Sequence, residues 1–500
     1  MPKLTGSVHR DCALLKSIFH APQNADFIVR TVSPHGVEMA VLYVDGMANR
    51  SGIEDMILRP LMNMRPFGTT PPGQRSAVLL QRVLPTGTGQ LSSDTDALVP
   101  FLLAGNVVVL CDGSENAVMA EMPGFATRGV SQPLTENAAF APHEAFNESI
   151  RVNLTLLHRA LHTPDLVTEF FTIGETSRTK AALVYLQNVA DEVLVSEARR
   201  RLNGVKVDKL LSIGQLQQLI EDDAHRILPQ MLQTERPDRA ASFLTDGMVV
   251  IVCDNAPYVL SAPATFLTFL HTPDDHALRW QYGTFIRFIR TLGFFISLLL
   301  PALYNALLLY HEDLLPADLM TSILEGYTLV PLSVTLELIL MNFIFDLINE
   351  ASLRMPGSMG STLGIVGGLV LGQAAVSANL ISPVLIIVVS VAGLGLFAVP
   401  SYPLSLAVRI VRLLLIAAST VAGFAGIALG MTALICSLAG MESFGTPCFA
   451  PLAPSMCKNG DGLFTRLDVR RQQRRAGMAR PQHEPEPQDP RAWDRNGGNA

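Results

Sequence analysis

The chain has 500 residues, of which 49% are hydrophobic and only 16% are charged, so it is too apolar for an ordinary soluble protein of several domains. Its formal net charge of -7 provides no basic field, and it has no zinc finger or basic-aromatic stripe, which argues against nucleic acid as a partner. The six cysteines are scattered without a CxxC pair, so they indicate neither a zinc site nor a redox site.

The apolar residues are unevenly distributed along the chain. Residues 1–284 mix charged and apolar side chains as a globular protein does, whereas 285–441 contains long apolar runs with few charges. The N-terminus has no apolar core long enough for a secretory signal peptide. We therefore predict a cytoplasmic α/β region, an α-helical polytopic membrane domain over 285–445, and a basic cytoplasmic tail over 446–500 whose last 25 or so residues are disordered.

Two pairs of sequence motifs repeat within the first region. Ala40-Val-Leu-Tyr-Val44 matches Ala182-Leu-Val-Tyr-Leu186, and Gly105-Asn-Val-Val-Val-Leu-Cys-Asp112 matches Gly247-Met-Val-Val-Ile-Val-Cys-Asp254. Both pairs have the same offset, since 182 minus 40 and 247 minus 105 are each 142. This common offset predicts two copies of one α/β unit, a first subdomain over 1–140 and a second over 141–284.

Each copy has the same predicted order of elements. A short apolar strand precedes an amphipathic helix, Ile53–Met64 in the first copy and Glu192–Leu202 in the second. A further strand ends at Cys111 or Cys253, and the polar residues that follow it predict a hairpin turn into another strand.

The α/β region contains no recognisable catalytic motif. Thr86-Gly-Thr-Gly89 is glycine-rich but lacks the lysine of a phosphate-binding loop, so it predicts a plain turn. HExxH and GxSxG are absent from the sequence. We predict that the protein is not an enzyme and has no catalytic residue, cofactor or metal site.

The first apolar segment runs from about Phe285 to Tyr310. Three arginines near its start, Arg279, Arg287 and Arg290, place that end on the cytoplasmic side by the positive-inside rule.

The second segment, about Val330–Leu353, is unusually polar for a membrane helix. At about 100° per residue, one face carries Thr335, Asn342, Asp346 and Asn349, while Glu337 lies nearly opposite Asp346. Charges at membrane depth are costly, so two polar directions predict two kinds of contact with protein or water. The alternative is that Asp346 and Glu350 lie at headgroup level beside Arg354 and only end the helix.

The third segment combines a small-residue stripe with a weakly polar face. The stripe predicts close packing against another helix and consists of Gly364, Gly368 and Gly372. The opposite side includes Thr362, Gln373 and Ser377. This side suits either water or an ion, or a hydrogen bond to another helix of the bundle.

A fourth segment covers about Pro383–Val399 and a fifth about Val411–Met441, and the basic tail beyond argues for a cytoplasmic C-terminus. Cytoplasmic ends on both sides require an even number of crossings, whereas five segments are predicted. One segment then does not cross, and the glycine-rich third is the best candidate for a re-entrant element.

Six stretches of the chain together resemble a known family, the A subunits of GerA-type germinant receptors of endospore-forming bacteria. They are Glu148-Ser-Ile-Arg-Val-Asn153, Gln233-Thr-Glu-Arg-Pro-Asp-Arg-Ala240 with the following 246–266 stretch, Ile348-Asn-Glu-Ala-Ser-Leu-Arg-Met-Pro356, Gly364-Ile-Val-Gly-Gly-Leu-Val-Leu-Gly-Gln-Ala-Ala375, Pro400-Ser-Tyr402 and Glu442-Ser-Phe-Gly-Thr-Pro-Cys-Phe-Ala-Pro451. Two stretches depart from the family pattern: Glu325-Gly-Tyr-Thr-Leu-Val-Pro331 matches it loosely, and the tail after Arg475 is extended.

The resemblance implies a protein of the spore inner membrane that works with a transporter-like B subunit and a lipoprotein C subunit. In that family the B subunit binds the nutrient, and the A subunit is thought to form a homo-oligomeric channel that releases monovalent cations when germination starts. The sporulation stage V AF protein is a close relative that acts as a germination accessory, so the resemblance covers that branch too.

From this we hypothesise a cation path lined by Thr362, Gln373 and Ser377. The acidic residues that would attract cations are Glu337, Asp346 and Glu350. Two rivals stay open. A transporter would place an unwound substrate site at Gly364–Gly372 and predicts inverted repeats, of which the sequence shows none. A signalling scaffold would use its helices only as an anchor and would not need buried polar positions.

Overall fold

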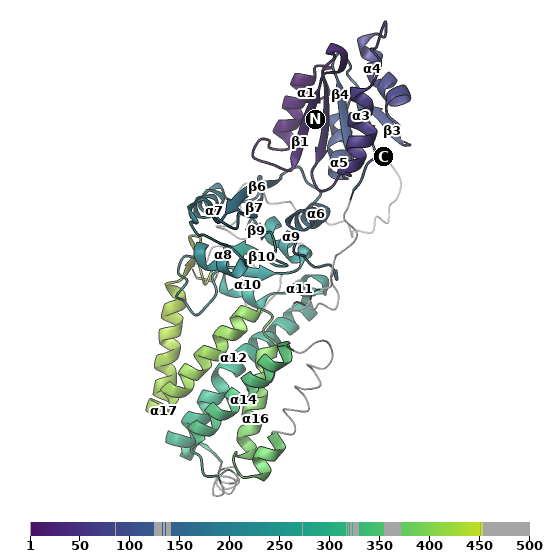
Figure 1. Cartoon of the computed structure of the whole chain (residues 1–500). Coiled ribbons are helices and arrows are strands. Elements are labelled where there is room, and N and C mark those ends of the chain that lie inside the picture. The colour runs from purple at the N-terminus through teal and green to yellow at the C-terminus, as the bar shows by residue number, and fades with distance from the viewer. Residues whose placement is uncertain are drawn as a thin grey trace, which may run out of the picture.

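The structure is a computed structural model that describes residues 2–85, 87–124, 142–272, 274–316, 330–354, 372–450 and 452–453, with the single positions 133, 136, 318, 320 and 323. Two α/β units are stacked above a group of long helices, so the molecule is elongated and follows the order of the chain (Figure 1). The predicted α/β region is confirmed, and a helical region follows it.

The first unit is a five-stranded antiparallel sheet with helices around it. Its strands are β1 (Phe27–Val32), β2 (Met39–Val44), β3 (Gly89–Ser92), β4 (Val107–Cys111) and β5 (Ala117–Ala120), in the order β1-β2-β4-β5-β3. Its helices are α1 (Val8–Ile18), the continuous run α2 (Arg50–Ile53), η2 (Glu54–Leu58) and α3 (Arg59–Met62), then α4 (Arg75–Val78) with η4 (Leu79–Val83), and α5 (Thr95–Leu103).

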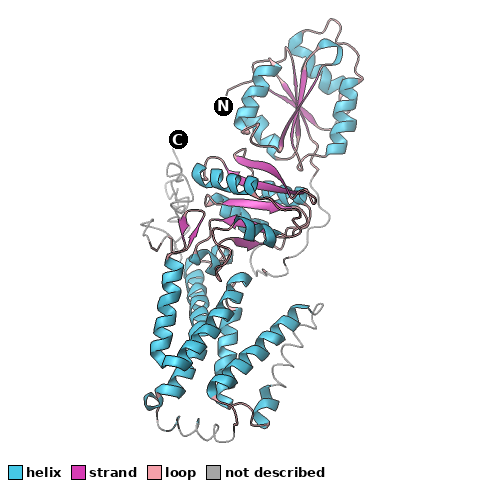
Figure 2. Cartoon of the chain, turned by 60° about the vertical axis from the view of Figure 1, so that its left-hand side comes forward, coloured by secondary structure: helices cyan, strands magenta, loops and turns pink. Residues whose placement is uncertain are grey.

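The side chains of β2 explain why this sheet has helices on both faces. Every residue of β2 is buried, and successive side chains of a strand point to opposite faces. Ala40 and Leu42 pack in one apolar cluster with α1 and α5, while Val41 and Tyr43 pack in another with α2 to α3. A continuous apolar strand therefore lies in the middle layer of three (Figure 2).

The second unit repeats this arrangement. Its strands are β6 (Leu166–Ile173), β7 (Thr179–Leu186), β8 (Leu232–Thr234), β9 (Val249–Cys253) and β10 (Val259–Ala262), in the order β6-β7-β9-β10-β8. Its helices are α6 (Ile150–Ala160), α7 (Glu192–Gly204), α8 (Ile213–Ile220) and α9 (Pro237–Thr245). The two sheets have the same strand order, and β4 and β9 hold equivalent places 142 residues apart, as the repeated motifs predict.

The two units contact each other through polar groups near the edge strand β6. Asn24 of the first unit donates from Nδ2 to the carbonyl oxygen of Leu166 at 3.1 Å. Nearby, Nε2 of His158 lies 3.2 Å from a carboxylate oxygen of Asp26, and both side chains are buried. These contacts cover part of the β6 edge, which would otherwise present unpaired backbone groups.

Two short helices, α10 (Phe266–Leu270) and α11 (Asp274–Ala277), lead from the second unit into the helical domain. Its long helices are α12 (Trp280–Tyr310), α14 (Val334–Arg354), α16 (Pro383–Phe397) and α17 (Tyr402–Ala439). Helices α12, α14 and α16 begin and end within five residues of the first, second and fourth predicted segments, respectively. By length and composition, α12 and α17 are the two described helices long and apolar enough to cross a membrane, and α16 is a shorter apolar helix.

The prediction for the fifth segment was wrong in two respects. Helix α17 begins at Tyr402 rather than near Val411, and it reverses direction at Ala422 and Gly423, where the backbone is not helical. Gly423 has a φ of 58°, which a residue with a side chain rarely adopts. In the second arm, a Cβ on Gly426 would collide with the Ala418 carbonyl oxygen of the first arm, so the two arms lie against each other. One predicted crossing is therefore a helical hairpin.

Candidate functional site: polar contacts inside the helical domain

Helix α14 directs polar side chains toward two different neighbours, in agreement with the two polar directions of its sequence. On one side, Thr335 donates from Oγ1 to Oδ1 of Asn305 on α12 at 2.9 Å. On the other side, a carboxylate oxygen of Glu337 accepts from the backbone N–H of Ser382 at 3.1 Å. The first direction leads to α12 and α17, and the second leads to α16.

Asn305 is the centre of a hydrogen-bond network among three helices. Its side chain is fully buried, and Nδ2 donates to Ser419 Oγ at 2.9 Å and to Thr420 Oγ1 at 3.0 Å, both on α17. With Thr335 bonded to its Oδ1, the amide connects α12, α14 and α17. Interhelical hydrogen bonds of this kind help to associate helices in apolar surroundings. The sequence offered only one pattern for finding Asn305, an isolated amide within an apolar run.

Glu337 lies at the N-terminus of α16, where it contacts Ser382, the residue before the helix. The first backbone N–H groups of a helix have no partner inside the helix, and the helix dipole favours a negative charge there. The side chain of Glu337 is fully buried in the single chain. Its contact is therefore an interhelical cap, which sequence reasoning did not predict.

Asp346 lies beside two arginines of α17. A carboxylate oxygen is 3.4 Å from Nη1 of Arg409 and 3.8 Å from Nη2 of Arg412, and Asn349 can turn its amide oxygen to accept from Arg409. Two guanidinium groups outweigh one carboxylate, so this cluster is net positive. Asp346 is thus engaged within the chain, which differs from the predicted role of attracting cations, whereas Glu350 is exposed one turn further along.

Only the end of the predicted third segment falls within the described residues. Residues 372–377 are helical, and the side chains of Gln373 and Ser377 are exposed there. A Cβ on Gly372 would meet no described residue within 4 Å, so no close helix contact is present at this glycine within the described part of the chain. The other predicted positions, Thr362, Gly364 and Gly368, lie outside the described residues.

Close helix packing through glycine occurs at positions that sequence reasoning did not select. Gly293 of α12 faces Gly395 of α16, and a Cβ on Gly395 would collide with the carbonyl oxygen of Gly293. Ser297, one turn beyond Gly293, is fully buried, with its backbone nitrogen beside Gly395. Gly293 and Ser297 are four residues apart, the small-residue spacing that could have indicated this contact.

The start of α12 is attached to the second subdomain by a buried ionic cluster. Asp275 of α11 accepts from Nε of Arg287 at 3.0 Å and from Nη1 of Arg290 at 3.0 Å. Thr272 donates to the same carboxylate from its hydroxyl group and its backbone N–H. Burial of Asp275 opposes its ionisation, but hydrogen bonds and charges from Arg290 and Arg287 outweigh that effect and hold its pKa below the usual value. Two of the arginines predicted to mark the membrane boundary thus also hold α12 to the α/β region.

The sequence matches the family model described as "Bacillus/Clostridium GerA spore germination protein" over residues 13–478. The chain belongs to this family. The match covers the α/β region, the helical domain and much of the tail, and it confirms the predicted resemblance. The family consists of germination proteins and is not known for catalysis.

Individual relatives cover most of this GerA-family chain. Spore germination protein KA of Bacillus subtilis (strain 168) is 34% identical over 445 residues, which cover 88% of this chain and 81% of that protein. Spore germination protein GerLA of Bacillus cereus is 32% identical, covering 88% and 90% respectively. A third relative, 31% identical over 437 residues and covering 87% and 84%, is described as the uncharacterized membrane protein YfkQ of Bacillus subtilis (strain 168).

A crystal structure of the N-terminal domain of the A subunit of the Bacillus megaterium spore germinant receptor GerK3 is also similar to this chain. It is 26% identical with a TM-score of 0.43, and the comparison covers 53% of this chain and 98% of that domain.

Proposed function

We propose that this chain is the A subunit of a nutrient germinant receptor in the spore inner membrane and that copies of it assemble into a ligand-gated channel for monovalent cations. Membership of the GerA spore germination family supports the receptor role. The partners in this proposal are a transporter-like B subunit that binds the nutrient and a lipoprotein C subunit.

The exposed side chains of α12 support a position across the bilayer. Trp280 and Tyr282 are exposed at its start, and Tyr310 is exposed at its end. At 1.5 Å per residue these aromatic groups are roughly 40 Å apart, close to the thickness of a bilayer with its headgroups. Trp and Tyr favour the membrane interface, so their spacing fits a helix that spans the whole layer.

The reversal of α17 supports a topology with both chain ends on the cytoplasmic side. The first arm, Tyr402–Val421, is about 20 residues long, or roughly 30 Å, which is enough to cross the hydrocarbon core. The second arm returns to the α/β region, where Arg226 donates from Nη1 to the carbonyl oxygen of Ser437 at 3.1 Å. When both arms of α17 cross the membrane, the five predicted segments give six crossings, the even number that two cytoplasmic ends require.

The observation that carries the channel proposal is the exposure of Gln373 and Ser377, four residues apart on one side of a helix in the apolar half of the chain. Polar side chains within a membrane face water or another protein, so these two fit a polar path formed between copies. Thr362 belongs to the same predicted face. Of the three acidic candidates, Glu350 has the most exposed side chain and is therefore the most accessible to cations in water, whereas Glu337 is buried and Asp346 is half-buried beside two arginines.

The proposal is tested by measuring potassium release after nutrient addition from spores that carry this chain with its B and C subunits. Gln373→Leu removes the polar group at nearly constant volume and is expected to slow release. The control is Thr432→Val, because Thr432 is also exposed but its hydroxyl group already bonds to the Ala428 carbonyl oxygen of its own helix. Equal release rates in the native and Gln373→Leu spores, at equal protein levels, would count against the proposed path.

A further inference from the structure

A short hairpin that follows α17 returns to the second α/β subdomain. It pairs β11 (Glu442–Ser443) with β12 (Thr446–Pro447), and we refer to residues 442–447 as the C-terminal hairpin. Its turn residues Phe444 and Gly445 both have a positive φ, 47° and 78°. Such a backbone is uncommon for a bulky residue and persists where surrounding contacts hold it. The contacts of Phe444 are therefore expected to hold this turn in place.

Phe444 packs into the apolar core of the second subdomain and is covered by Arg201 of α7. The ring is 7% exposed and belongs to the same cluster as residues of α7, α8 and β9. The guanidinium carbon of Arg201 lies 4.1 Å from the ring centroid, a cation–π geometry. The ring thus lies between the subdomain core and a charged side chain.

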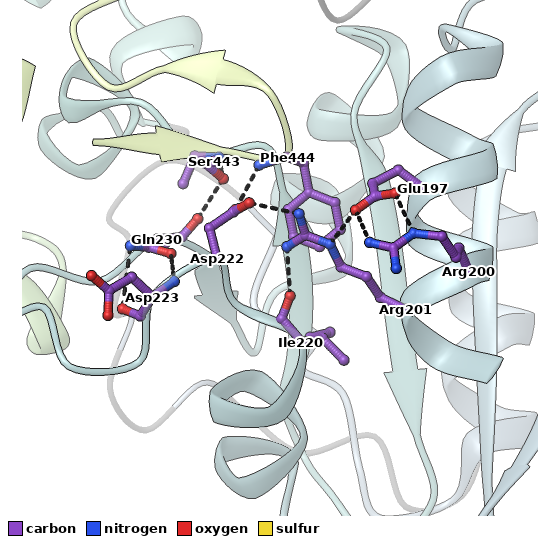
Figure 3. A network of polar contacts seen from close by, with 10 residues as sticks. Glu197, Arg200, Arg201, Ile220, Asp222, Asp223, Gln230, Ser443 and Phe444 are labelled. Carbon is purple, nitrogen blue, oxygen red and sulfur yellow. Dashed lines mark hydrogen bonds and ion pairs between the residues drawn. The ribbon is translucent and has the colours of Figure 1, made fainter. Parts of the chain in front are cut away.

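One carboxylate joins this arginine to the hairpin backbone (Figure 3). Asp222 accepts from the backbone N–H of Phe444 at 2.9 Å with one oxygen and from Nη2 of Arg201 at 2.6 Å with the other. Arg201 also donates to the Ile220 carbonyl oxygen at 2.7 Å and to Glu197 at 2.7 Å. Hydrogen bonds from Arg200 and Arg201 lower the pKa of Glu197 to about 2, so this carboxylate stays charged at neutral pH and orients Arg201.

Ser443 provides a second attachment. Its side chain is buried, and Oγ donates to the Gln230 carbonyl oxygen at 2.6 Å and accepts from the backbone N–H of Ala264 at 3.0 Å. A third attachment follows β12, where the Cys448 carbonyl oxygen accepts from the backbone N–H of Phe266 at 2.8 Å. The hairpin is therefore held by segments on both sides of β8 to β10, not by one surface residue.

The hairpin lies directly beyond the membrane-spanning part of the chain in our proposal. Only Gly440 and Met441 separate the end of α17 from β11, and Met441 is buried against Leu438 and Cys448. Since α12 is attached to the same subdomain through Asp275, the second subdomain holds both the first and the last helix of the helical domain. A movement of that subdomain would act on both helices.

We propose that the C-terminal hairpin is the link through which the second α/β subdomain sets the position of the second arm of α17. The inference rests on the proposed channel function, because it concerns how the opening of that channel is controlled. Releasing the hairpin should uncouple the α/β region from the helices while both remain folded.

Two neighbouring arginines offer a matched pair for the test. Arg201→Ala removes the group that covers Phe444 and bonds to Asp222, whereas Arg200→Ala removes an exposed side chain that bonds only to Glu197 among the described residues. Cys448, which is buried beside the hairpin, reports release through its labelling by a thiol reagent. Cys253, buried in the core of the second subdomain, reports unfolding in the same sample.

In the full-length protein, Arg201→Ala is expected to raise the labelling rate of Cys448 at least about tenfold, the factor that one hydrogen bond to a charged group contributes. Cys253 should stay protected, and Arg200→Ala should match the native chain. In spores with the B and C subunits, Arg201→Ala should delay germination and Arg200→Ala should not. Phe444→Ala provides a second variant with the same expectations.

Two results would overturn the proposal. One is faster labelling of Cys448 in Arg201→Ala with germination equal to that of Arg200→Ala, which would show that the hairpin transmits nothing. The other is unchanged labelling in both Arg201→Ala and Phe444→Ala. Failure of the channel proposal looks different, because the native protein itself would then pass no cations even though the labelling results hold.

Discussion

Arg287 donates a hydrogen bond from Nε to a carboxylate oxygen of Asp275 at 3.0 Å, and both side chains are only 1% exposed. The pair joins α11, at the end of the α/β region, to α12, the first long helix of the helical domain. Arg290 approaches the same carboxylate, so one acidic group neutralises much of the charge of two arginines. The structure therefore places the carboxylate of Asp275 between two arginines at the junction of the two halves of the chain.

Asp275→Asn should destabilise this junction strongly. The substitution keeps the shape of the side chain but leaves Arg287 and Arg290 without their carboxylate in a buried position, which costs about 3 kcal/mol. Thermal unfolding of the purified protein in detergent should show a lower midpoint. Asp313→Asn, at an exposed position in the short helix that follows α12, is the control, and equal midpoints for the two variants would contradict the assignment.

The ion pair between Asp275 and Arg287 also predicts that the stability of the protein depends on pH. The pKa of Asp275 is lower in the folded chain than the value of about 3.9 in an unfolded one, so its contribution to stability is present above that value. The contribution is lost as the pH falls through the folded pKa. The difference in unfolding midpoint between the native chain and Asp275→Asn should therefore be constant from pH 7 to about 5 and shrink below about pH 4. A difference that stays the same at pH 3 would argue against an ionised Asp275.

Asn305→Ala should loosen the contacts among α12, α14 and α17. The variant loses hydrogen bonds to Ser419, Thr420 and Thr335, and interhelical bonds in membranes contribute roughly 0.6 to 1.7 kcal/mol each. The expected result is a lower unfolding midpoint in detergent. Thr432→Ala, which removes a bond within one helix, should have a smaller effect, and the reverse order would contradict the network.

Two glycine substitutions separate the observed helix contact from the predicted one. Gly395→Ala forces a methyl group against the Gly293 carbonyl oxygen, so α12 and α16 must separate and the protein should lose stability or fail to assemble. Gly372→Ala meets no atom of the described residues within 4 Å. If Gly372 packs between copies, its alanine variant will change the oligomer on size-exclusion chromatography and leave the unfolding midpoint of the single chain nearly unchanged.

The α/β half could be predicted well from the sequence because its information is local. The repeat at 142 residues and the continuous apolar strands determine which strands correspond in the two sheets, and both pairs of matched motifs fall on equivalent strands. The hairpin turns after Cys111 and Cys253 follow from short polar breaks between such strands and are confirmed by the antiparallel pairing. These features need no knowledge of distant contacts.

The helical half was predicted less well because its polar residues act across long sequence separations. The pairing of Asp346 with Arg409 and Arg412, and that of Glu337 with Ser382, depends on which helices lie side by side, and periodicity does not determine that. The reversal of α17 at Gly423 was also not predicted. A run of 38 apolar-rich helical residues is longer than one crossing needs, and that excess length was the available sign of a hairpin.

The most direct test of the central claim is cation flux through the purified protein in liposomes. The account predicts potassium flux through the assembled oligomer, alone or after addition of the partner subunits and nutrient, and a lower flux for Gln373→Leu and Glu350→Gln than for Thr432→Val. A folded, assembled oligomer that passes no potassium even with its partners and nutrient present would contradict the account and leave the non-conducting scaffold as the better description.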